Sequence, residues 1–317
     1  MKSIPNFPEK LAKVFEFGAC LREDGYRGRF APSPSGPLHL GNFRTALISW
    51  LIARINGGKW ILRIDDIDSP RIRSGSIQKI QEDLNWLGIT WDGPIIYQSN
   101  RQELYNAALE YFKVQGKLYA CNCSRKRQSN IYMKKGYNQI CNCKNLGLSW
   151  EKNNGKIPSL KLITSQDFSL SLDDVIVRRA DNFISYNLAT VIDELALGIT
   201  EIVRGNDLIK AMNSQLAVFE SLKQSPIPFR HIPLLLNPDL TKISKREGAN
   251  CIDYYKDKGI NASMLIGWLA ATIGLVPFKS KLTSLDLLYE LKHKRDSSDI
   301  YSLFNKCSSH HSFLDCI

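Results

Sequence analysis

The sequence predicts an α/β fold built around a parallel sheet, and three observations support that prediction. Over residues 29–88, extended segments alternate with helical patterns. Glycines stand where one kind of segment gives way to the next. The composition is that of a globular chain, with 44% hydrophobic and 23% charged residues among 317. Strands that alternate with helices form parallel sheets, because each helix carries the chain back to the edge where the next strand begins.

The first extended segment covers residues 29–36, where prolines hold the residues before them out of helical space. After Gly41, apolar residues recur three and four apart, which is the spacing of an amphipathic helix. Gly57 and Gly58 end that helix, since glycine is common just beyond a helix C-terminus. These residues supply the first strand, turn and helix of the predicted sheet.

A second strand is predicted over residues 60–64, and a second helix over residues 77–87. Residues 118–157 show little apolar periodicity, as expected of an inserted subdomain. Apolar runs between residues 172 and 202 favour strands, including the run at 186–189. Residues 262–294 favour helix.

The chain is basic, with 42 Lys and Arg against 31 Asp and Glu and a formal charge of +11. This balance indicates an anionic partner such as nucleic acid or a phosphate-rich ligand, or else a generally basic proteome. The composition excludes a disordered chain, a collagen-like repeat and a small disulfide scaffold. The longest apolar run, residues 264–276, is shorter than the ~20 residues of a membrane helix. We therefore expect a cytoplasmic protein without membrane contact.

Four of the eight cysteines, Cys121, Cys123, Cys141 and Cys143, lie close together in the sequence. In a cytosolic protein, clustered cysteines favour a metal site over disulfides, because the compartment is reducing. Cysteine thiolates at this separation suit a structural zinc ion. On chemistry alone all four are the predicted ligands, and four reduced thiols without metal are the alternative.

Two short motifs bear residues suited to phosphate chemistry. Residues 37–42 open a helix, whose N-terminus offers unpaired N–H groups and a partial positive charge. Gly41 allows a nucleotide to approach the backbone, and His39 can donate a hydrogen bond to charge that develops on phosphate. Residues 242–246 place three cations in five positions, which repel one another unless an anion lies beside them. Taken singly, each motif is better explained by a structural histidine or a solvated basic turn.

Together, the two motifs resemble the paired HIGH and KMSKS signatures of class I aminoacyl-tRNA synthetases, and the resemblance is closest to the glutamyl type. It covers most of the chain, from about residue 29 to residue 276, in the same linear order. Further matching segments lie at residues 29–34, 62–68, 88–93, 97–99, 186–189 and 202–205.

The resemblance implies a Rossmann-type class I synthetase catalytic domain with an inserted zinc-containing subdomain and a short C-terminal helical region. On that basis the chain divides into an N-terminal extension (1–28), the first half of the catalytic domain (29–98), the inserted zinc-containing subdomain (99–180), the second half of the catalytic domain (181–238), and the KMSKS-type loop with the C-terminal helical region (239–317).

The resemblance also implies ATP-dependent activation of L-glutamate. A glutamate carboxylate oxygen attacks the α-phosphate of Mg²⁺-bound ATP, and pyrophosphate leaves. Such chemistry depends on positioning and on neutralisation of phosphate charge. By position in the motifs, the implied catalytic residues are His39, Lys242 and Lys245. The implied ATP-binding residues are His39, Gly41, Asn42 and Lys245.

By the same resemblance, the glutamate-binding residues are Arg29, Ala31, Ser33, Asp65, Tyr186 and Arg204. Arginine suits this role, because its planar fork binds a carboxylate bidentately. Asp65 stands where the family usually has a glutamate facing the substrate amine. Either a small shift or a water molecule keeps the amine contact, or Asp65 contributes less in this chain. Thr190 replaces a common asparagine, and Asn42 ends a motif that usually ends in histidine.

The cysteine cluster is similar to that of the glutamyl-Q tRNA(Asp) synthetases, which carry Cys-x-Cys followed by Tyr-x-x-x-Cys. This resemblance implies one structural zinc ion per chain, held by Cys121, Cys123, Tyr137 and Cys141. Cys143 is an additional thiol and competes with Tyr137 for the fourth place.

Few residues follow Arg246, where a full-length glutamyl-tRNA synthetase carries a large helical anticodon-binding region. This feature also resembles the glutamyl-Q tRNA(Asp) synthetases. The resemblance implies transfer of activated glutamate to the queuosine base of tRNA-Asp, with the queuosine-bearing anticodon stem-loop as partner and a monomer as the active state. The alternatives are a truncated glutamyl-tRNA synthetase that charges the tRNA 3′ end, and a synthetase paralog that binds tRNA without catalysis.

Overall fold

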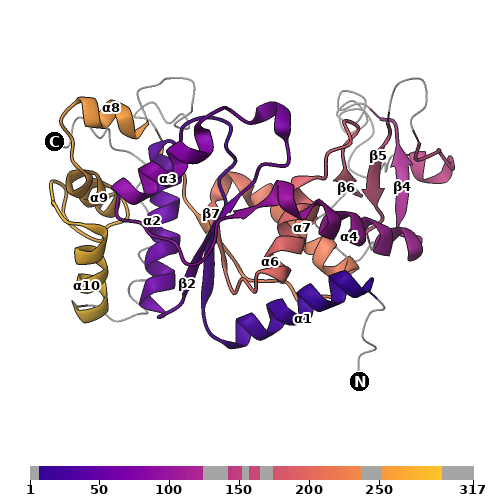
Figure 1. The fold of residues 1–317 in the computed structure, drawn as a ribbon, viewed down its shortest axis with the longest axis horizontal. Coiled ribbons are helices and arrows are strands. Elements are labelled where there is room, and N and C mark those ends of the chain that lie inside the picture. The colour runs from indigo at the N-terminus through magenta and orange to yellow at the C-terminus, as the bar shows by residue number, and fades with distance from the viewer. Residues whose placement is uncertain (1–6, 124–141, 152–156, 165–173, 237–250, 295–317) are drawn as a thin grey trace. The chain divides into compact units, whose positions relative to one another are not determined.

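The computed structural model describes residues 7–123, 142–151, 157–164, 174–236 and 251–294 (Figure 1). The chain folds into two compact units, and each is assembled from three separate stretches of sequence. The first, here called the sheet unit, comprises residues 22–98, 199–209 and 228–317. The second, the insert unit, comprises residues 1–21, 99–198 and 210–227.

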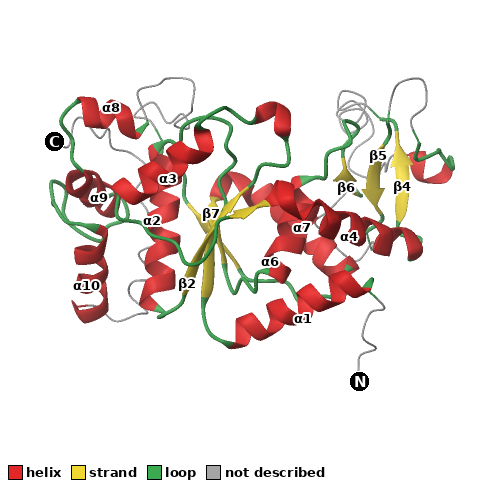
Figure 2. Ribbon diagram, viewed as in Figure 1, coloured by secondary structure: helices red, strands yellow, loops and turns green. Residues whose placement is uncertain are grey.

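The sheet unit contains the predicted parallel sheet, whose strands are yellow in Figure 2. Strands β1 (Arg27–Phe30), β2 (Lys59–Ile64) and β3 (Ile96–Tyr97) pair in parallel in that order. Strand β7 (Ile202–Gly205) pairs in parallel with β8 (Phe229–Ile232). β1 and β7 lie next to each other, and the Thr200 N–H donates to the Arg27 carbonyl at 3.0 Å. The expected α/β fold with a parallel sheet is confirmed.

Helix α2 (Leu40–Ile55) connects β1 to β2 and packs on β1, β2 and β7. Helices α9 (Ala262–Ala271) and α10 (Ser284–Lys294) also contact it, so most of its side chains are buried. Trp50 is among them, and its indole N–H donates to the Thr90 carbonyl at 3.0 Å. Full burial of a large apolar side chain contributes ~1.5–3 kcal/mol, so α2 is a main source of the unit's stability.

The helical prediction over residues 262–294 corresponds to two helices, α9 and α10. Gly274, with φ at 79°, and Pro277 lie between the two helices. A left-handed residue and a proline both interrupt helical hydrogen bonding, so the chain cannot continue as one helix through this segment. A Cβ on Gly267 of α9 would lie 1.8 Å from the Ser280 carbonyl oxygen, so only glycine fits there. Helices α3 (Ser76–Trp86) and α8 (Ile252–Asp257) also belong to this unit. Within the ranges that the structure describes, no helix combines the length and the apolar character needed to cross a bilayer.

The insert unit contains an antiparallel sheet of β4 (Leu118–Cys121), β5 (Ser159–Leu162) and β6 (Val175–Arg178). Its helices α4 (Gln102–Val114) and α6 (Tyr186–Ala196) contact each other, and α7 (Ile209–Ser221) belongs to the unit from its second residue on. The fully buried Asp193 of α6 accepts hydrogen bonds from Arg101 Nε at 2.6 Å and from the Tyr105 hydroxyl at 3.0 Å. This charged, doubly satisfied contact fixes α6 against the start of α4.

The prediction of strand at residues 186–189 is wrong, because these residues begin α6. The Ser185 hydroxyl caps the helix by accepting from the Leu188 N–H at 3.3 Å. Every side chain from Leu188 to Ala196 is buried, and these include the polar Thr190, Asp193 and Glu194. The run at 186–189 is only four residues long, which is too short for its period to distinguish helix from strand.

Residues 1–28, taken from sequence as an extension, contain helix α1 (Glu9–Glu23) and the start of β1. Only Leu11, Phe15 and Gly18 of α1 are buried, which is too narrow a stripe to produce a clear helical period. At Gly18 a Cβ would lie 1.9 Å from the Leu195 carbonyl oxygen. The helix therefore packs backbone against backbone on the end of α6.

Candidate functional site

The predicted phosphate-binding motif forms the N-terminus of α2, with His39 as the N-cap. His39 Nδ1 accepts a hydrogen bond from the Asn42 N–H at 3.3 Å, and Asn42 Oδ1 accepts one from the His39 N–H at 3.1 Å. These two bonds are a capping box, in which each side chain satisfies the other residue's backbone donor. Since Nδ1 accepts, a neutral imidazole carries its proton on Nε2, the atom suited to donating to phosphate.

The structure explains two features of this motif. Asn42 replaces the usual histidine, and its amide oxygen closes the capping box. A Cβ on Gly41 would lie 3.1 Å from both Cε1 and Nδ1 of His39, so glycine leaves room for the imidazole to turn onto its own helix. The expected approach of a nucleotide at Gly41 stays a prediction, and the room needed by His39 is a second reason for glycine at this position.

The carboxyl ends of the parallel strands gather three of the predicted glutamate-binding positions in the sheet unit. Ala31 and Ser33 follow β1, and Asp65 follows β2. The Asp65 N–H donates to the Pro32 carbonyl at 3.0 Å, which joins the two segments just beyond the strands. In open parallel sheets this edge is where ligands bind.

Arg29 lies on β1 and is 4% exposed. Its Nη1 donates to the Val203 carbonyl on β7 at 2.9 Å. Arg204, the next residue along β7, is also 4% exposed. The structure thus brings two of the predicted carboxylate-binding arginines onto neighbouring strands.

Asp65 forms a buried ion pair with Arg63, a residue that the sequence reasoning did not single out. Arg63 Nε lies 2.7 Å from Asp65 Oδ1, and Nη2 lies 3.2 Å from Oδ2. The Asp65 side chain is 6% exposed and the Arg63 side chain is fully buried. The signal was available, because residues two apart in a strand lie on the same face of a sheet.

His231 on β8 is a second polar neighbour of the site that sequence reasoning did not find. It lies opposite Arg204 in the β7–β8 register, and Arg204 Nε donates to His231 Nε2 at 3.1 Å. Burial, together with the Arg204 guanidinium, lowers the pKa of His231, so the imidazole is neutral at pH 7. The register of strands far apart in sequence cannot be obtained from local patterns, so no sequence signal identified this pair.

The remaining predicted residues either belong to the insert unit or fall outside the described residues. Tyr186 is the first residue of α6 in the insert unit and is partly exposed, and Thr190, one turn further along, is buried. Lys242 and Lys245 fall outside the residues that the structure describes. Their roles stay predictions.

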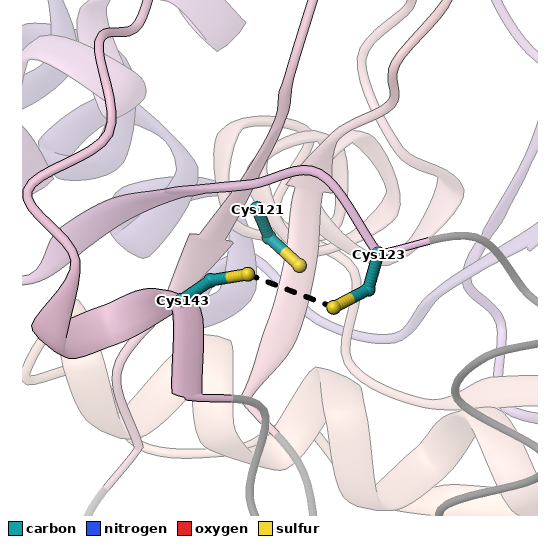
Figure 3. A group of neighbouring side chains, drawn as sticks. All are labelled: Cys121, Cys123 and Cys143. Carbon is teal, nitrogen blue, oxygen red and sulfur yellow. Dashed lines mark hydrogen bonds between the residues drawn. The ribbon is translucent and has the colours of Figure 1, made fainter.

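The insert unit brings three cysteines together (Figure 3). Cys121 ends β4, Cys123 follows it, and Cys143 arrives on a short 3₁₀ helix, Asn142–Asn145. Their Sγ atoms all lie within 4.8 Å of one another, and those of Cys123 and Cys143 are 3.6 Å apart. Two thiolates on a tetrahedral zinc ion, each about 2.3 Å from the metal, are ~3.8 Å apart. The three side chains therefore fit a zinc ion, whereas Tyr137 and Cys141 lie outside the described residues.

The catalytic domain of the class I tRNA synthetases (E and Q) matches residues 26–157 and 160–285 of this chain. The chain therefore belongs to that family, and it is an enzyme of the ligase class. The expected class I synthetase catalytic domain is confirmed.

Among curated relatives, the chain is 50% identical over 289 residues to the glutamyl-Q tRNA(Asp) synthetase of Prochlorococcus marinus (strain MIT 9313), across 90% of this chain and 94% of that protein. It is 44% identical over 285 residues to the glutamyl-Q tRNA(Asp) synthetase of Synechococcus sp. (strain CC9605), across 90% and 96% of the two chains. It is 38% identical to the glutamate–tRNA ligase of Oleidesulfovibrio alaskensis, but that match spans 55% of the ligase.

One solved structure with this fold is a glutamate tRNA ligase from Elizabethkingia meningosepticum in complex with its amino acid. Its TM-score is 0.73 at 24% identity, with 92% of this chain and 68% of that chain covered. This likeness extends the confirmed fold over nearly the whole chain.

Proposed function

We propose that this enzyme activates L-glutamate with ATP and transfers it to the queuosine base in the anticodon of tRNA-Asp. The observation that carries the proposal is the 50% identity to a glutamyl-Q tRNA(Asp) synthetase over 94% of that protein's length. The match to a glutamate–tRNA ligase, by contrast, spans 55% of the ligase. Because its substrate is tRNA, the enzyme acts in the cytoplasm, and we propose that it acts as a monomer.

In the first step, a carboxylate oxygen of glutamate attacks the α-phosphorus of Mg²⁺-bound ATP, the bond to the bridging oxygen breaks, and pyrophosphate leaves with that electron pair. His39 Nε2–H donates to the phosphate oxygens, and the Gly41 N–H faces the same anion. Asn42, whose N–H is used within the capping box, contributes by holding the His39 ring. Lys242 and Lys245 neutralise the charge that develops there. The capping box supports this role, because it holds the imidazole in one orientation and one tautomer.

The amino acid binds at the carboxyl edge of the sheet. Arg29 and Arg204 hold its carboxylates, and Asp65 accepts from its ammonium group. Ala31 and Ser33 complete this edge of the sheet unit, and Tyr186 keeps the glutamate-binding role that its sequence motif gives it. The burial of both arginines on adjacent strands supports this assignment, since a guanidinium shielded from water binds a carboxylate more strongly.

A structural zinc ion in the insert unit is part of the proposal. Cys121 and Cys123 supply two ligands, and the segment that carries Tyr137, Cys141 and Cys143 supplies the others. The convergence of Cys143 on the first two thiols favours it as the third ligand. When bound, the ion cross-links β4 to the 3₁₀ helix Asn142–Asn145 and leaves no open coordination position for chemistry.

In the second step, a hydroxyl of the queuosine cyclopentene ring attacks the carbonyl of glutamyl-adenylate. An ester bond forms, the hydroxyl proton is lost and AMP leaves. The experiment supplies ATP, labelled glutamate and tRNA-Asp with or without queuosine. Label on the queuosine-bearing tRNA alone, located by nuclease digestion on the anticodon nucleoside, is the expected result.

Two other results would contradict the proposal. Label on tRNA-Glu, located by nuclease digestion on the 3′-terminal adenosine, would identify a truncated glutamyl-tRNA synthetase. Binding of tRNA without any labelling, together with no glutamate-dependent exchange of pyrophosphate into ATP, would identify a tRNA-binding paralog.

A further inference from the structure

The side chain of Arg204 is held by two residues of the neighbouring strand. In the parallel β7–β8 pair, Arg204 stands opposite His231, and its Nε–H donates to His231 Nε2 at 3.1 Å. Phe229 lies two residues before His231, so the two rings lie on one face of β8. The guanidinium carbon of Arg204 is 4.6 Å from the centre of the Phe229 ring.

The two rings are themselves arranged as a platform. Their centroids are 6.0 Å apart and their planes differ by 11°. A cation above an aromatic face gains electrostatic attraction, and a hydrogen bond at Nε sets the rotation of the guanidinium plane. Arg204 therefore has both its position and its plane fixed from one strand.

The opposite face of the same strands carries a different contact. Arg230 Nε donates to Glu201 Oε1 at 2.9 Å, and the Tyr26 hydroxyl donates to Glu201 Oε2 at 2.9 Å. Arg230, which binds Glu201, and His231, which binds Arg204, are adjacent residues of β8 and so point to opposite faces of that strand. This ion pair joins the same two strands without touching Arg204, which makes it a matched structural control.

We propose that His231 is a positioning residue, which holds Arg204 so that its guanidinium meets a carboxylate of the amino-acid substrate. The inference rests on the proposed function, because that assigns Arg204 to glutamate. His231 acts through Arg204 and makes no contact with the reacting phosphate. Its neutral imidazole accepts at Nε2 and therefore carries its proton on Nδ1.

The test compares three variants that change one property at a time. H231Q places an amide oxygen near the position of Nε2, H231N carries the same amide one methylene too short, and H231L removes the acceptor. We expect H231L and H231N to raise the KM for glutamate roughly tenfold or more, since a lost hydrogen bond to a charged group is worth about that much. We expect H231Q to stay within about threefold of the unaltered enzyme, and the KM for ATP to stay unchanged in all three.

The readouts are glutamate-dependent pyrophosphate exchange and glutamate binding by titration calorimetry. E201Q is the control, and we expect a lower melting temperature with an unchanged glutamate KM. H231N keeps a polar side chain at the position, so it serves if H231L does not fold. Thermal unfolding of each variant separates a folding defect from a binding defect.

The outcomes separate this inference from the proposed function. If R204K weakens glutamate binding while H231N and H231L do not, the positioning role is wrong and the pocket assignment stands. If H231Q is as impaired as H231L, the acceptor is not what matters, and the inference is overturned. If R204K itself leaves glutamate binding unchanged, Arg204 does not bind the substrate, and the pocket proposed above fails together with this inference.

Discussion

Arg63 and Asp65 form a bidentate ion pair at the end of β2, with Nε 2.7 Å from Oδ1 and Nη2 3.2 Å from Oδ2. Both side chains are shielded from solvent. The guanidinium therefore fixes the direction of the carboxylate. By the resemblance described above, this position usually carries a glutamate. In this chain the carboxylate of the shorter Asp65 side chain is held in place by Arg63, two residues before it.

A buried ion pair predicts an asymmetric response to substitution. R63M should lower the free energy of unfolding by ~3–5 kcal/mol, because it leaves the Asp65 carboxylate buried and unpaired. The double variant R63M/D65L should recover most of that loss, since neither charge remains. Urea unfolding of the two variants measures both values. Equal losses in the single and double variants would contradict a coupled pair.

The same pair predicts a binding effect for Asp65. D65N keeps the size of the side chain but removes the charge that a substrate ammonium would meet. We expect the KM for glutamate to rise by about tenfold, with the KM for ATP unchanged, because charge-assisted hydrogen bonds are about twice as strong as neutral ones. Pyrophosphate exchange at varied glutamate and ATP measures the two constants. An unchanged glutamate KM would show that Asp65 serves Arg63 alone.

At His39, the two functions of one imidazole can be separated. H39N keeps an efficient N-cap but lacks the Nε2 donor, so we expect glutamate activation to fall by ~10²–10³ with little change in melting temperature. N42A removes one arm of the capping box and leaves Nε2 in place, so we expect a loss of ~1 kcal/mol of stability with most activity retained. Pyrophosphate exchange and thermal unfolding are measured for both. A large loss of activity in N42A with unchanged stability would contradict this division.

The zinc site predicts which thiols matter. We expect one zinc ion per chain by elemental analysis. We expect C121S and C143S to contain less zinc and to have a lower melting temperature than the unaltered protein. C251S is the matched control, because Cys251 belongs to the sheet unit and does not join the cysteine group. C141S tests the alternative assignment from the sequence. Full zinc content in C143S with loss in C141S would show that Cys141 is the third ligand.

A pH dependence follows from His231. Burial and Arg204 lower its pKa in the folded protein, whereas in the unfolded chain the pKa is about 6.5. At pH values between these two pKa values, the unfolded chain binds more protons than the folded protein. The contribution of His231 to the free energy of unfolding is therefore fully present above about pH 6.5, and it is lost as the pH falls toward the pKa of the folded state. The free energy of unfolding, measured in urea at about pH 5 and pH 7, should differ less between the two pH values for H231Q than for the unaltered protein. Equal differences would contradict a neutral His231 in the folded state.

Some elements of the fold could be predicted from the sequence, and others could not. The strand at Lys59–Ile64 and the start of α2 were predictable, because glycines, prolines and a clear 3.6-residue period mark them. The start of α6 was misread as strand, since the apolar run at 186–189 is too short to show a helical period. α1 was missed for the opposite reason, since few of its residues are buried.

The candidate site divides in the same way. His39, Asp65 and Arg204 were found because short motifs carry them. Their partners needed structure: His231 depends on the pairing of strands that are far apart in sequence. The capping role of Asn42 depends on side-chain geometry that a motif does not encode. The sequence left open whether Cys143 is a zinc ligand. The proximity of its Sγ atom to those of Cys121 and Cys123 favours that role.

The interleaving of the two units has a practical consequence for dissecting the protein. A gene divided after Gln98 would leave β1, β2 and β3 on one fragment and β7 and β8 on the other, although β1 and β7 are neighbours. Neither fragment could bury its half of the sheet alone. Two such fragments expressed together would form a split enzyme, in which recovery of activity reports their reassembly.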